Sequence, residues 1–289
     1  MRPALTTMLV VSGLSSVGAQ GIAPIPYRMD ARAPASAKRL EQATIFDSAY
    51  KRPRDIWVYT PPGYDSKAPT RYPLVVAFDG FDYRDTMPLP FILDTLLATG
   101  AAPASIAVLI DDGGGAARIA DLGNAHLMVD FLSRQLIPYA RAHWRVTTDP
   151  HRVIVTGSSA GGLGAAFVAL ARPDLFGNVL SQSGAFWRGA EASNDEPYEW
   201  LTAHVAASPR KDVRFYMDVG EYEDHATLGG SGPNFLAATR RFHDALLAKG
   251  YRVDYVEVPK GMHAPQYWMQ QLPTALAGLL KGEGDERRR

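Results

Sequence analysis

The stretch that decides the fold, residues 151–162, reads His-Arg-Val-Ile-Val-Thr-Gly-Ser-Ser-Ala-Gly-Gly. It contains a short apolar run typical of a buried strand, and an apolar stripe at helical spacing begins at Leu163. Between them, residues 157–161 fit the pattern Gly-x-Ser-x-Gly with Ser159 at its centre. A strand, this pentapeptide and a helix in that order predict a nucleophile elbow, a sharp turn that holds a serine hydroxyl above a sheet.

The residues around Ser159 suit the attack of a serine on an acyl carbon. Gly157 and Gly161 leave room where larger side chains would collide with the strand and the helix. The backbone N–H of Ala160 would then point at the oxyanion that forms during the attack. The alternative is a small-residue turn with an incidental serine. The flanking strand and helix favour Ser159 as the nucleophile and Ala160 as an oxyanion-hole donor.

A serine hydroxyl is a poor nucleophile without a base, and His263 stands where such a base is expected. In α/β hydrolases the chain order is serine, acid, histidine, so the histidine follows the last strand. His263 comes after the apolar run at 253–258 and before the last helical pattern. We therefore predict that His263 is the catalytic base.

The acid that orients the base should lie just beyond the preceding strand, which we place at 213–219. Three carboxylates follow that strand, Glu221, Glu223 and Asp224. Asp218 fits less well because it belongs to the strand itself. Composition cannot choose among the three, and Glu223 is our first choice.

A second oxyanion-hole donor is expected from the turn after the strand at 74–78. That turn reads Asp-Gly-Phe-Asp at 79–82. Gly80 lets the backbone approach closely, and the N–H of Phe81 is the predicted donor.

The rest of the chain alternates short apolar runs with helical patterns, which favours an α/β architecture. The runs lie at 56–60, 74–78, 106–110, 153–155, 179–180, 213–219 and 253–258. Central runs are apolar on both faces, as in covered parallel sheets. About 30 residues separate the runs at 179–180 and 213–219, too few for a full lid domain. We predict an α/β-hydrolase fold with a mostly parallel central sheet, helices on both faces and no large lid domain.

Both ends of the chain differ from this pattern. Residues 1–19 combine Arg2, an apolar stretch and a small-residue ending, which predicts a signal peptide and export to the periplasm or the medium. The apolar stretch is too short to span a bilayer, so we expect no integral membrane segment in the mature chain. We assign 20–40 to a leader, 41–282 to the catalytic domain and 283–289 to a charged tail.

Composition narrows the functional classes. The chain has 289 residues, with 30 Lys and Arg against 30 Asp and Glu, so a nucleic-acid partner is not expected. It has no cysteine, which excludes thiolate nucleophiles and zinc–sulfur sites. Zinc-protease, phosphate-loop and dinucleotide motifs are missing, so we predict no metal site and no cofactor. The predicted partner is a small-molecule ester, and the oligomeric state stays open.

These residues resemble the "putative esterase" family, which includes enterochelin esterases, feruloyl esterases, esterase D and mycolyltransferases. The resemblance covers roughly 44–280 and rests on Val-Tyr-Thr-Pro-Pro-Gly-Tyr at 58–64 and Leu-Ser-Gln-Ser-Gly-Ala-Phe-Trp at 180–187. The spacing of Arg118, Leu122 and Asn124 is similar to that of the siderophore branch. The usual Gly-Gly-His-Asp is Gly-Met-His-Ala at 261–264.

The resemblance implies Ser159 as nucleophile, His263 as base and Glu223 as acid. Some exported single-domain members, which this chain resembles most, are thought to use serine and histidine alone. We therefore expect a serine carboxylic ester hydrolase that acts through an acyl-enzyme on a bulky ester, a catecholate siderophore lactone or an aryl ester. The alternatives are an acyltransferase of the same fold and a general short-chain carboxylesterase.

Four residues are expected to bind the substrate. Trp187 offers an aromatic face, and Arg118 and Arg188 are placed in loops near the same rim, where they could pair with negative charge. Asn124 joins them through its spacing from Arg118.

Overall fold

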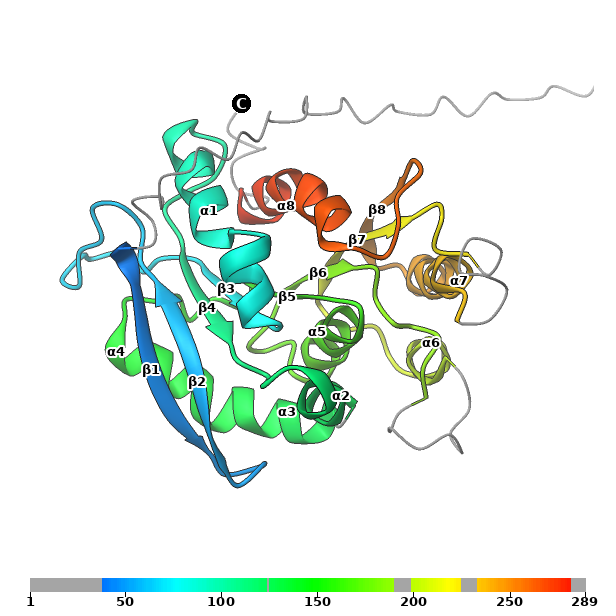
Figure 1. Ribbon diagram of the computed structural model, residues 1–289, viewed down its shortest axis with the longest axis horizontal. Coiled ribbons are helices and arrows are strands. Elements are labelled where there is room, and N and C mark those ends of the chain that lie inside the picture. The colour runs from blue at the N-terminus through cyan, green and yellow to red at the C-terminus, as the bar shows by residue number, and fades with distance from the viewer. Residues whose placement is uncertain (1–37, 124, 190–198, 225–232, 282–289) are drawn as a thin grey trace, which may run out of the picture.

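The computed structural model describes residues 38–123, 125–189, 199–224 and 233–281. Its centre is an eight-stranded sheet in the order β1-β2-β4-β3-β5-β6-β7-β8 (Figure 1). The first two strands, β1 (Leu40–Asp47) and β2 (Arg52–Tyr59), pair antiparallel, and β2 is antiparallel to β4. The other strands pair in parallel, which confirms the predicted mostly parallel sheet. They are β3 (Leu74–Ala77), β4 (Ile106–Ile110), β5 (Val153–Ser158), β6 (Asn178–Gln182), β7 (Arg214–Gly220) and β8 (Arg252–Val258).

Helices cover both faces of the sheet, as predicted (Figure 1). Successive residues of a strand point to opposite faces, so Val75 and Val76 belong to two different apolar cores. One core is closed by α1 (Leu89–Ala98) and α8 (Pro265–Leu280). The other is closed by α2 (Gly115–Gly123), α3 (Ala125–Phe131), α4 (Ile137–His143), α5 (Ala160–Ala171), α6 (Trp200–Ala207) and α7 (Phe235–Ala248).

β1 is a strand that the apolar runs do not predict. Four of its eight residues are exposed, and it lies at the edge of the sheet, so its hydropathy shows no continuous apolar run. It begins at Leu40, the last residue of the predicted leader.

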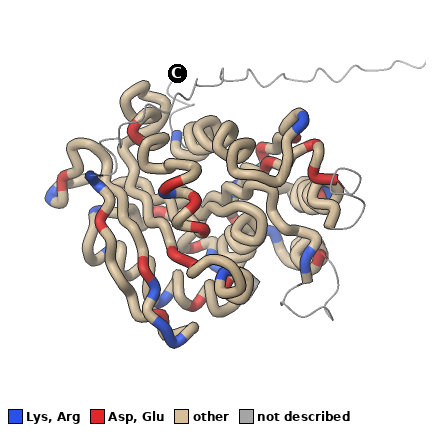
Figure 2. Tube along the Cα trace, viewed as in Figure 1, with Lys and Arg blue, Asp and Glu red and all other residues tan. Residues whose placement is uncertain are grey.

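Lys and Arg are interspersed with Asp and Glu over the described elements, in keeping with the balanced composition (Figure 2). No helix in the described ranges has the length and apolar character needed to cross a bilayer. Residues 1–19, the predicted signal peptide, and residues 283–289, the predicted tail, lie outside those ranges. The parallel strands β3 to β8 all end at one edge of the sheet, and the segments that follow them carry the predicted site residues.

Candidate active site

Ser159 forms the turn between β5 and α5 and has φ +56° and ψ −118°. This conformation is strained for a residue with a side chain and is the one that a nucleophile elbow needs. Two backbone hydrogen bonds hold the turn beside the end of β6. Ser159 N donates to the carbonyl of Gln182 (2.8 Å), and Ala185 N donates to the carbonyl of Ser159 (2.9 Å).

Gly157, the first glycine of the motif, lies where the end of β5 meets the start of α5. A Cβ atom there would come within 2.6 Å of the carbonyl carbon of Gly161, so only glycine fits. Ala160 is the first residue of α5, and the N–H groups of a first helical turn have no partner inside the helix. Its N–H is therefore available at the elbow.

His263 lies in the segment between β8 and α8 and contacts Glu223. Its Nδ1 is 2.6 Å from Oε2 of Glu223, which follows the end of β7 by three residues and is fully buried. Glu221, one of the alternative acids, is exposed and accepts a hydrogen bond from Lys260 N instead. The structure thus places Glu223 where it can orient the imidazole.

Ser183, which the sequence analysis did not single out, connects three parts of the site. Its Oγ donates to Oε1 of Glu223 (2.5 Å) and accepts from Nε1 of Trp268 (2.7 Å). Gly220 N donates to the same carboxylate oxygen (2.8 Å). Ser183 follows β6 and has φ +46°. The Ser-Gln-Ser-Gly stretch at 181–184, where that strand ends, was the available signal.

Ser159 and His263 both follow strands that end at the carboxyl edge of the sheet, and the described residues show no hydrogen bond between their side chains. Such a bond is often long when no substrate is present and tightens in the reacting complex. The arrangement is therefore compatible with a serine and its base.

The turn after β3 carries the predicted second donor. Gly80 packs on the end of β4, where a Cβ atom would lie 2.6 Å from the carbonyl oxygen of Ile110. Phe81 is the N-cap of a short π-helical turn at Asp82–Thr86, so its N–H precedes the helical hydrogen bonds. Its side chain is half exposed. Asp79, at the start of this turn, has φ +56°.

Arg118 joins this turn to the elbow. Its Nε and Nη2 donate to the carboxylate of Asp79, with Nη2 2.9 Å from Oδ2, and Nη2 also donates to the carbonyl of Ser158 (3.1 Å). The prediction that Arg118 lies in a loop is wrong, because α2 begins at Gly115 and includes it. Its guanidinium already has a carboxylate partner in this structure.

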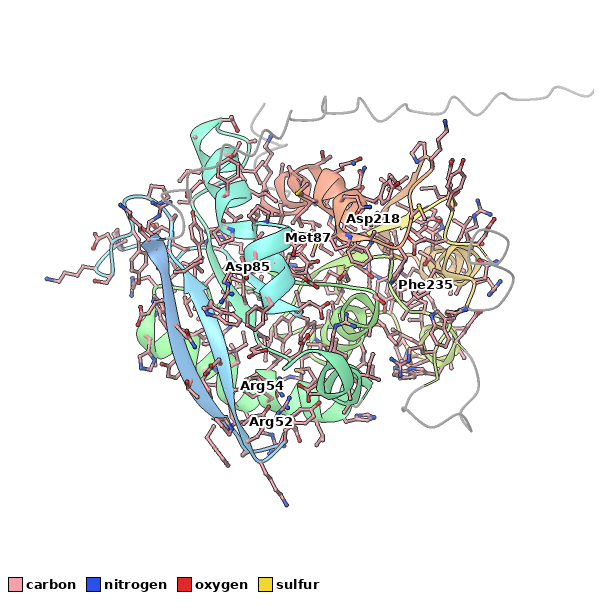
Figure 3. All side chains as sticks on the ribbon, viewed as in Figure 1. Arg52, Arg54, Asp85, Met87, Asp218 and Phe235 are labelled. Atoms are coloured by element: carbon pink, nitrogen blue, oxygen red, sulfur yellow. The ribbon has the colours of Figure 1, made fainter. Side chains whose placement is uncertain are left out.

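The helix that carries Arg118 is itself anchored from the edge hairpin. Asp121 of α2 accepts from Arg52 and from the buried Arg54, whose Nη1 is 2.6 Å from Oδ2 of Asp121. Nε of Arg54 also donates to Asp47 on β1 (2.9 Å). Figure 3 labels the two arginines on the second strand.

Trp187 and Arg188 lie in the segment after β6, and Phe235 lies between Trp187 and His263. Phe235 at the start of α7, labelled in Figure 3, contacts His263 with tilted rings 4.3 Å apart between centroids and meets Trp187 edge-on at 6.1 Å. Nε1 of Trp187 is buried without a hydrogen-bond partner among the described residues. Asn124 lies outside the described residues.

Arg188 is half-buried and has no ion-pair partner in the described part of the chain. Burial, and then the neighbouring Arg118, lower the pKa of its guanidinium. The half-buried Arg188 guanidinium and the Trp187 indole N–H are both hydrogen-bond donors. Together they favour the binding of a negatively charged acceptor group at this rim.

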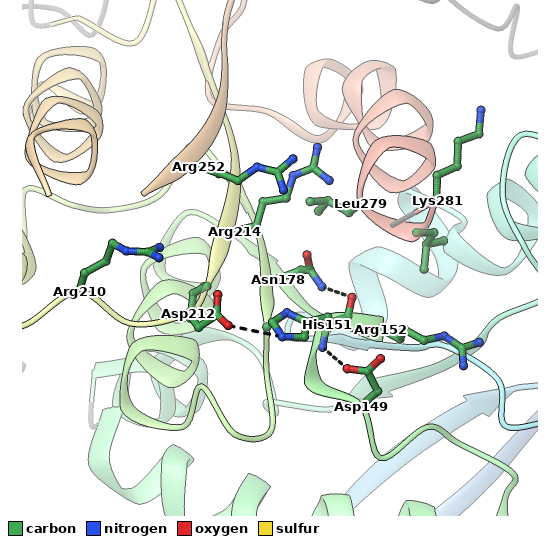
Figure 4. A pocket seen from close by; sticks show the side chains of 13 residues that line it. Asp149, His151, Arg152, Asn178, Arg210, Asp212, Arg214, Arg252, Leu279 and Lys281 are labelled. Carbon is green, nitrogen blue, oxygen red and sulfur yellow. Dashed lines mark hydrogen bonds and ion pairs between the residues drawn. The ribbon is translucent and has the colours of Figure 1, made fainter. Parts of the chain in front are cut away.

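A separate pocket of about 560 Å³ lies at the other end of the sheet (Figure 4). Its lining comes from the amino ends of β6, β7 and β8, including Asn178, Arg214 and Arg252, and from the end of α8. None of the predicted site residues lines it.

Comparison with known proteins places this geometry in context. A model of the family described as "Putative esterase" matches residues 48–279. The iron(III) enterobactin esterase of Dickeya dadantii is 32% identical over 264 residues, 86% of this chain and 57% of that protein. That of Escherichia coli K12 is 34% identical over 138 residues, 47% of this chain and 34% of that protein. The chain thus spans little more than half the length of the first of these relatives.

Solved structures share the fold. The Shigella flexneri enterobactin esterase, determined in the presence of enterobactin, aligns with a TM-score of 0.72 and 24% identity over 84% of this chain and 59% of that one. A ferulic acid esterase from Anaeromyces mucronatus, in complex with ferulic acid, aligns with a TM-score of 0.65 and 20% identity over 82% of this chain and 89% of that one. These likenesses confirm the α/β-hydrolase type of fold.

Proposed function

The chain belongs to the "putative esterase" family, and we propose that it is a serine ester hydrolase that works through an acyl-enzyme on a bulky aryl or catecholate ester. The observation that carries the proposal is the buried Glu223 carboxylate on Nδ1 of His263, at the same sheet edge as the strained Ser159. This is the set of groups that makes a serine hydroxyl nucleophilic.

The chemistry follows from the positions of these groups. Nε2 of His263 takes the proton of Ser159 Oγ while Oγ bonds to the acyl carbon, and Glu223 holds Nδ1–H and stabilises the imidazolium. The N–H groups of Ala160 and Phe81 stabilise the oxyanion. When the ester C–O bond breaks, His263 gives its proton to the leaving alcohol. Water then attacks the acyl-enzyme by the same route and releases the acid and free Ser159.

The substrate class is inferred from the rim. Arg188 has no carboxylate partner among the described residues, and Trp187 Nε1 is buried and unused. Both suit an aromatic acyl group that carries negative oxygens, such as a catecholate. Relatives named enterobactin esterase and neighbours named ferulic acid esterase support an aryl or siderophore ester. If the ester is a ferric siderophore, the iron belongs to the substrate.

We propose further that the protein acts after export, because residues 1–19 have the pattern of a signal peptide. Expression of the full chain in a bacterial host, followed by fractionation and mass determination of the N-terminus, tests this. Protein retained in the cytoplasm with residue 2 intact would contradict it.

The central experiment compares hydrolysis of a catecholate trilactone, a feruloyl ester and an acetyl ester with the same leaving group as the feruloyl ester. We expect the highest kcat/KM for the aryl or catecholate ester and a covalent acyl adduct on Ser159 by mass spectrometry. Ser159→Ala should lose several orders of magnitude in rate, because a broken triad retains only roughly 10³–10⁴ over water. Ser208→Ala, which lies at the end of α6, is the control.

Two outcomes point to the alternatives. Fastest turnover of the acetyl ester would favour a general short-chain carboxylesterase. Ester formation in place of free acid, when an alcohol acceptor is added, would favour an acyltransferase. Activity that survives Ser159→Ala would overturn the proposed mechanism.

A further inference from the structure

Asp112 is a buried carboxyl group that the mechanism above does not use. It follows β4 and points toward Arg118 of α2. Its Oδ1 accepts a hydrogen bond from Gly114 N (2.9 Å). Its Oδ2 is buried, accepts no hydrogen bond from another described residue and lies 3.7 Å from Nε of Arg118, beyond hydrogen-bonding distance. An ionised carboxylate oxygen in this position would be costly.

The neighbouring carboxylate, that of Asp79, explains the arrangement. Both carboxyl groups lie beside the same guanidinium, because Nε of Arg118 donates to Oδ1 of Asp79 and is 3.7 Å from Oδ2 of Asp112. An ionised carboxylate is only an acceptor, so two carboxyl groups can share a hydrogen bond only if one of them carries a proton. Asp79 already accepts two hydrogen bonds from Arg118 and faces Ser158, which leaves Asp112 as the carboxyl group with an unpartnered oxygen. The proton then belongs on Oδ2 of Asp112.

We propose that Asp112 is a positioning residue that stays protonated in the working enzyme and donates a hydrogen bond to Asp79. Asp112, Asp79 and Arg118 then hold the oxyanion turn, the turn after β3 that carries Phe81, against the nucleophile elbow. The inference rests on the proposed function for its kinetic part. With the proton in place, the three side chains carry no net charge. Without it, two buried carboxylates share one guanidinium, and their repulsion moves Asp79 and the turn that it begins.

The surrounding charges decide when the proton is lost. Asp79 faces Asp112 from the turn after β3, with Asp82 near Asp79, and Arg118 faces it from α2, with Arg188 near Arg118. Arg52 reaches the adjacent Gly113, within 3.8 Å of a Cβ position there. Burial, and then Asp79, raise the pKa of Asp112 to about 7. The hold of Asp112, Asp79 and Arg118 on the oxyanion turn should therefore weaken as the pH rises through neutrality.

The kinetic test uses Asp112→Asn, in which an amide N–H takes the place of the carboxyl proton and cannot titrate. For the wild type we expect kcat to fall by about tenfold above neutral pH while KM changes little, as expected when transition-state stabilisation alone is lost. Asp112→Asn should keep its kcat at high pH, and Asp112→Ala, which has no donor, should be low at every pH. Asp111→Asn, the neighbouring carboxylate, is the matched control and should behave as the wild type.

A spectroscopic test does not depend on activity. In the Ser159→Ala background, the infrared difference spectrum between the Asp112 and Asp112→Asn proteins should show the carbonyl band of a protonated carboxylic acid at pH 6 and lack it at pH 9, because the contribution of any other protonated carboxyl group cancels in the difference. Absence of an Asp112-dependent band overturns the inference. So does an alkaline fall in kcat that persists in Asp112→Asn or vanishes in Asp111→Asn. If the band is found but no ester is hydrolysed, the proposed function fails and the proton on Asp112 stands.

Discussion

A Cβ atom on Gly161 would lie 2.5 Å from Oδ2 of Asp79. The second glycine of the elbow motif therefore makes room for a carboxylate from another strand end. That carboxylate is the one held by Arg118, which also donates to the carbonyl of Ser158. Glycine is therefore needed at position 161 because the nucleophile elbow contacts the oxyanion turn there.

Gly161→Ala should displace Asp79 and lower kcat by roughly 10–100-fold with a small change in KM, at a stability cost of about 1–3 kcal/mol from overpacking. Steady-state kinetics and thermal unfolding measure both effects. Gly164→Ala is the control, because it lies in α5 as well and its Cβ would meet Leu122 at an ordinary 3.6 Å. A wild-type kcat in Gly161→Ala would show that Asp79 does not need this space.

Ser183→Ala removes the hydroxyl between Glu223 and Trp268 and leaves a buried indole N–H without its acceptor. We expect a loss of about 1–3 kcal/mol in the free energy of unfolding and a lower kcat, because Glu223 is held less firmly. Ser181→Ala, two residues earlier on β6, should be nearly neutral, since the Ser181 hydroxyl is buried and has no hydrogen-bond partner among the described residues. Equal effects of the two substitutions in chemical denaturation and kinetics would refute a special role for Ser183.

Glu223→Gln should leave the fold intact and reduce kcat by up to roughly 10⁴, by analogy with removal of the acid's charge in a serine triad. Glu221→Gln, in the exposed alternative acid, should be mild. If Glu223→Gln is also mild, the enzyme works with serine and histidine alone, and the contact of Glu223 with His263 is structural.

Arg188→Gln should raise KM for a catecholate or other anionic aryl ester by roughly 10–100-fold, the value of a charge-assisted hydrogen bond of about 1.5–3 kcal/mol. KM for a neutral acetyl ester should not change, because that substrate offers no negative oxygen to the guanidinium. Arg172→Gln, whose arginine is paired with Asp174 away from the site, is the control. An equal rise in KM for both esters would argue against charge recognition.

Asp218, labelled in Figure 3, gives a pH dependence of stability. Burial raises the pKa of its carboxyl well above the ordinary value, so the folded chain keeps a proton that the unfolded chain releases above about pH 4. Unfolding therefore becomes more favourable as the pH rises, by up to about 1.4 kcal/mol per pH unit. Urea unfolding at pH 5 and pH 8 should show a smaller loss for Asp218→Asn than for the wild type. Asp130→Asn, exposed on α3, should follow the wild type.

Local pattern predicted the elbow, the central strands and the position of His263, because each is encoded in a few consecutive residues. Ser183 escaped prediction because its role depends on Glu223 and Trp268, which come from distant parts of the chain. Arg118 was placed in a loop because three consecutive glycines, 113–115, lead into α2, and all three have positive φ. Glu223 could be separated from Glu221 only by burial, which composition does not reveal.

Three neighbouring strand ends, after β3, β5 and β6, each carry a non-glycine residue with positive φ: Asp79, Ser159 and Ser183. Each such conformation costs on the order of 1–3 kcal/mol, and a glycine would adopt it without that cost. Selection for heat resistance alone would therefore favour glycine at these positions. A variant stabilised by such glycine substitutions should lose catalytic activity, because these three residues position the groups at this edge of the sheet. Engineering of this kind therefore needs an activity screen at every round.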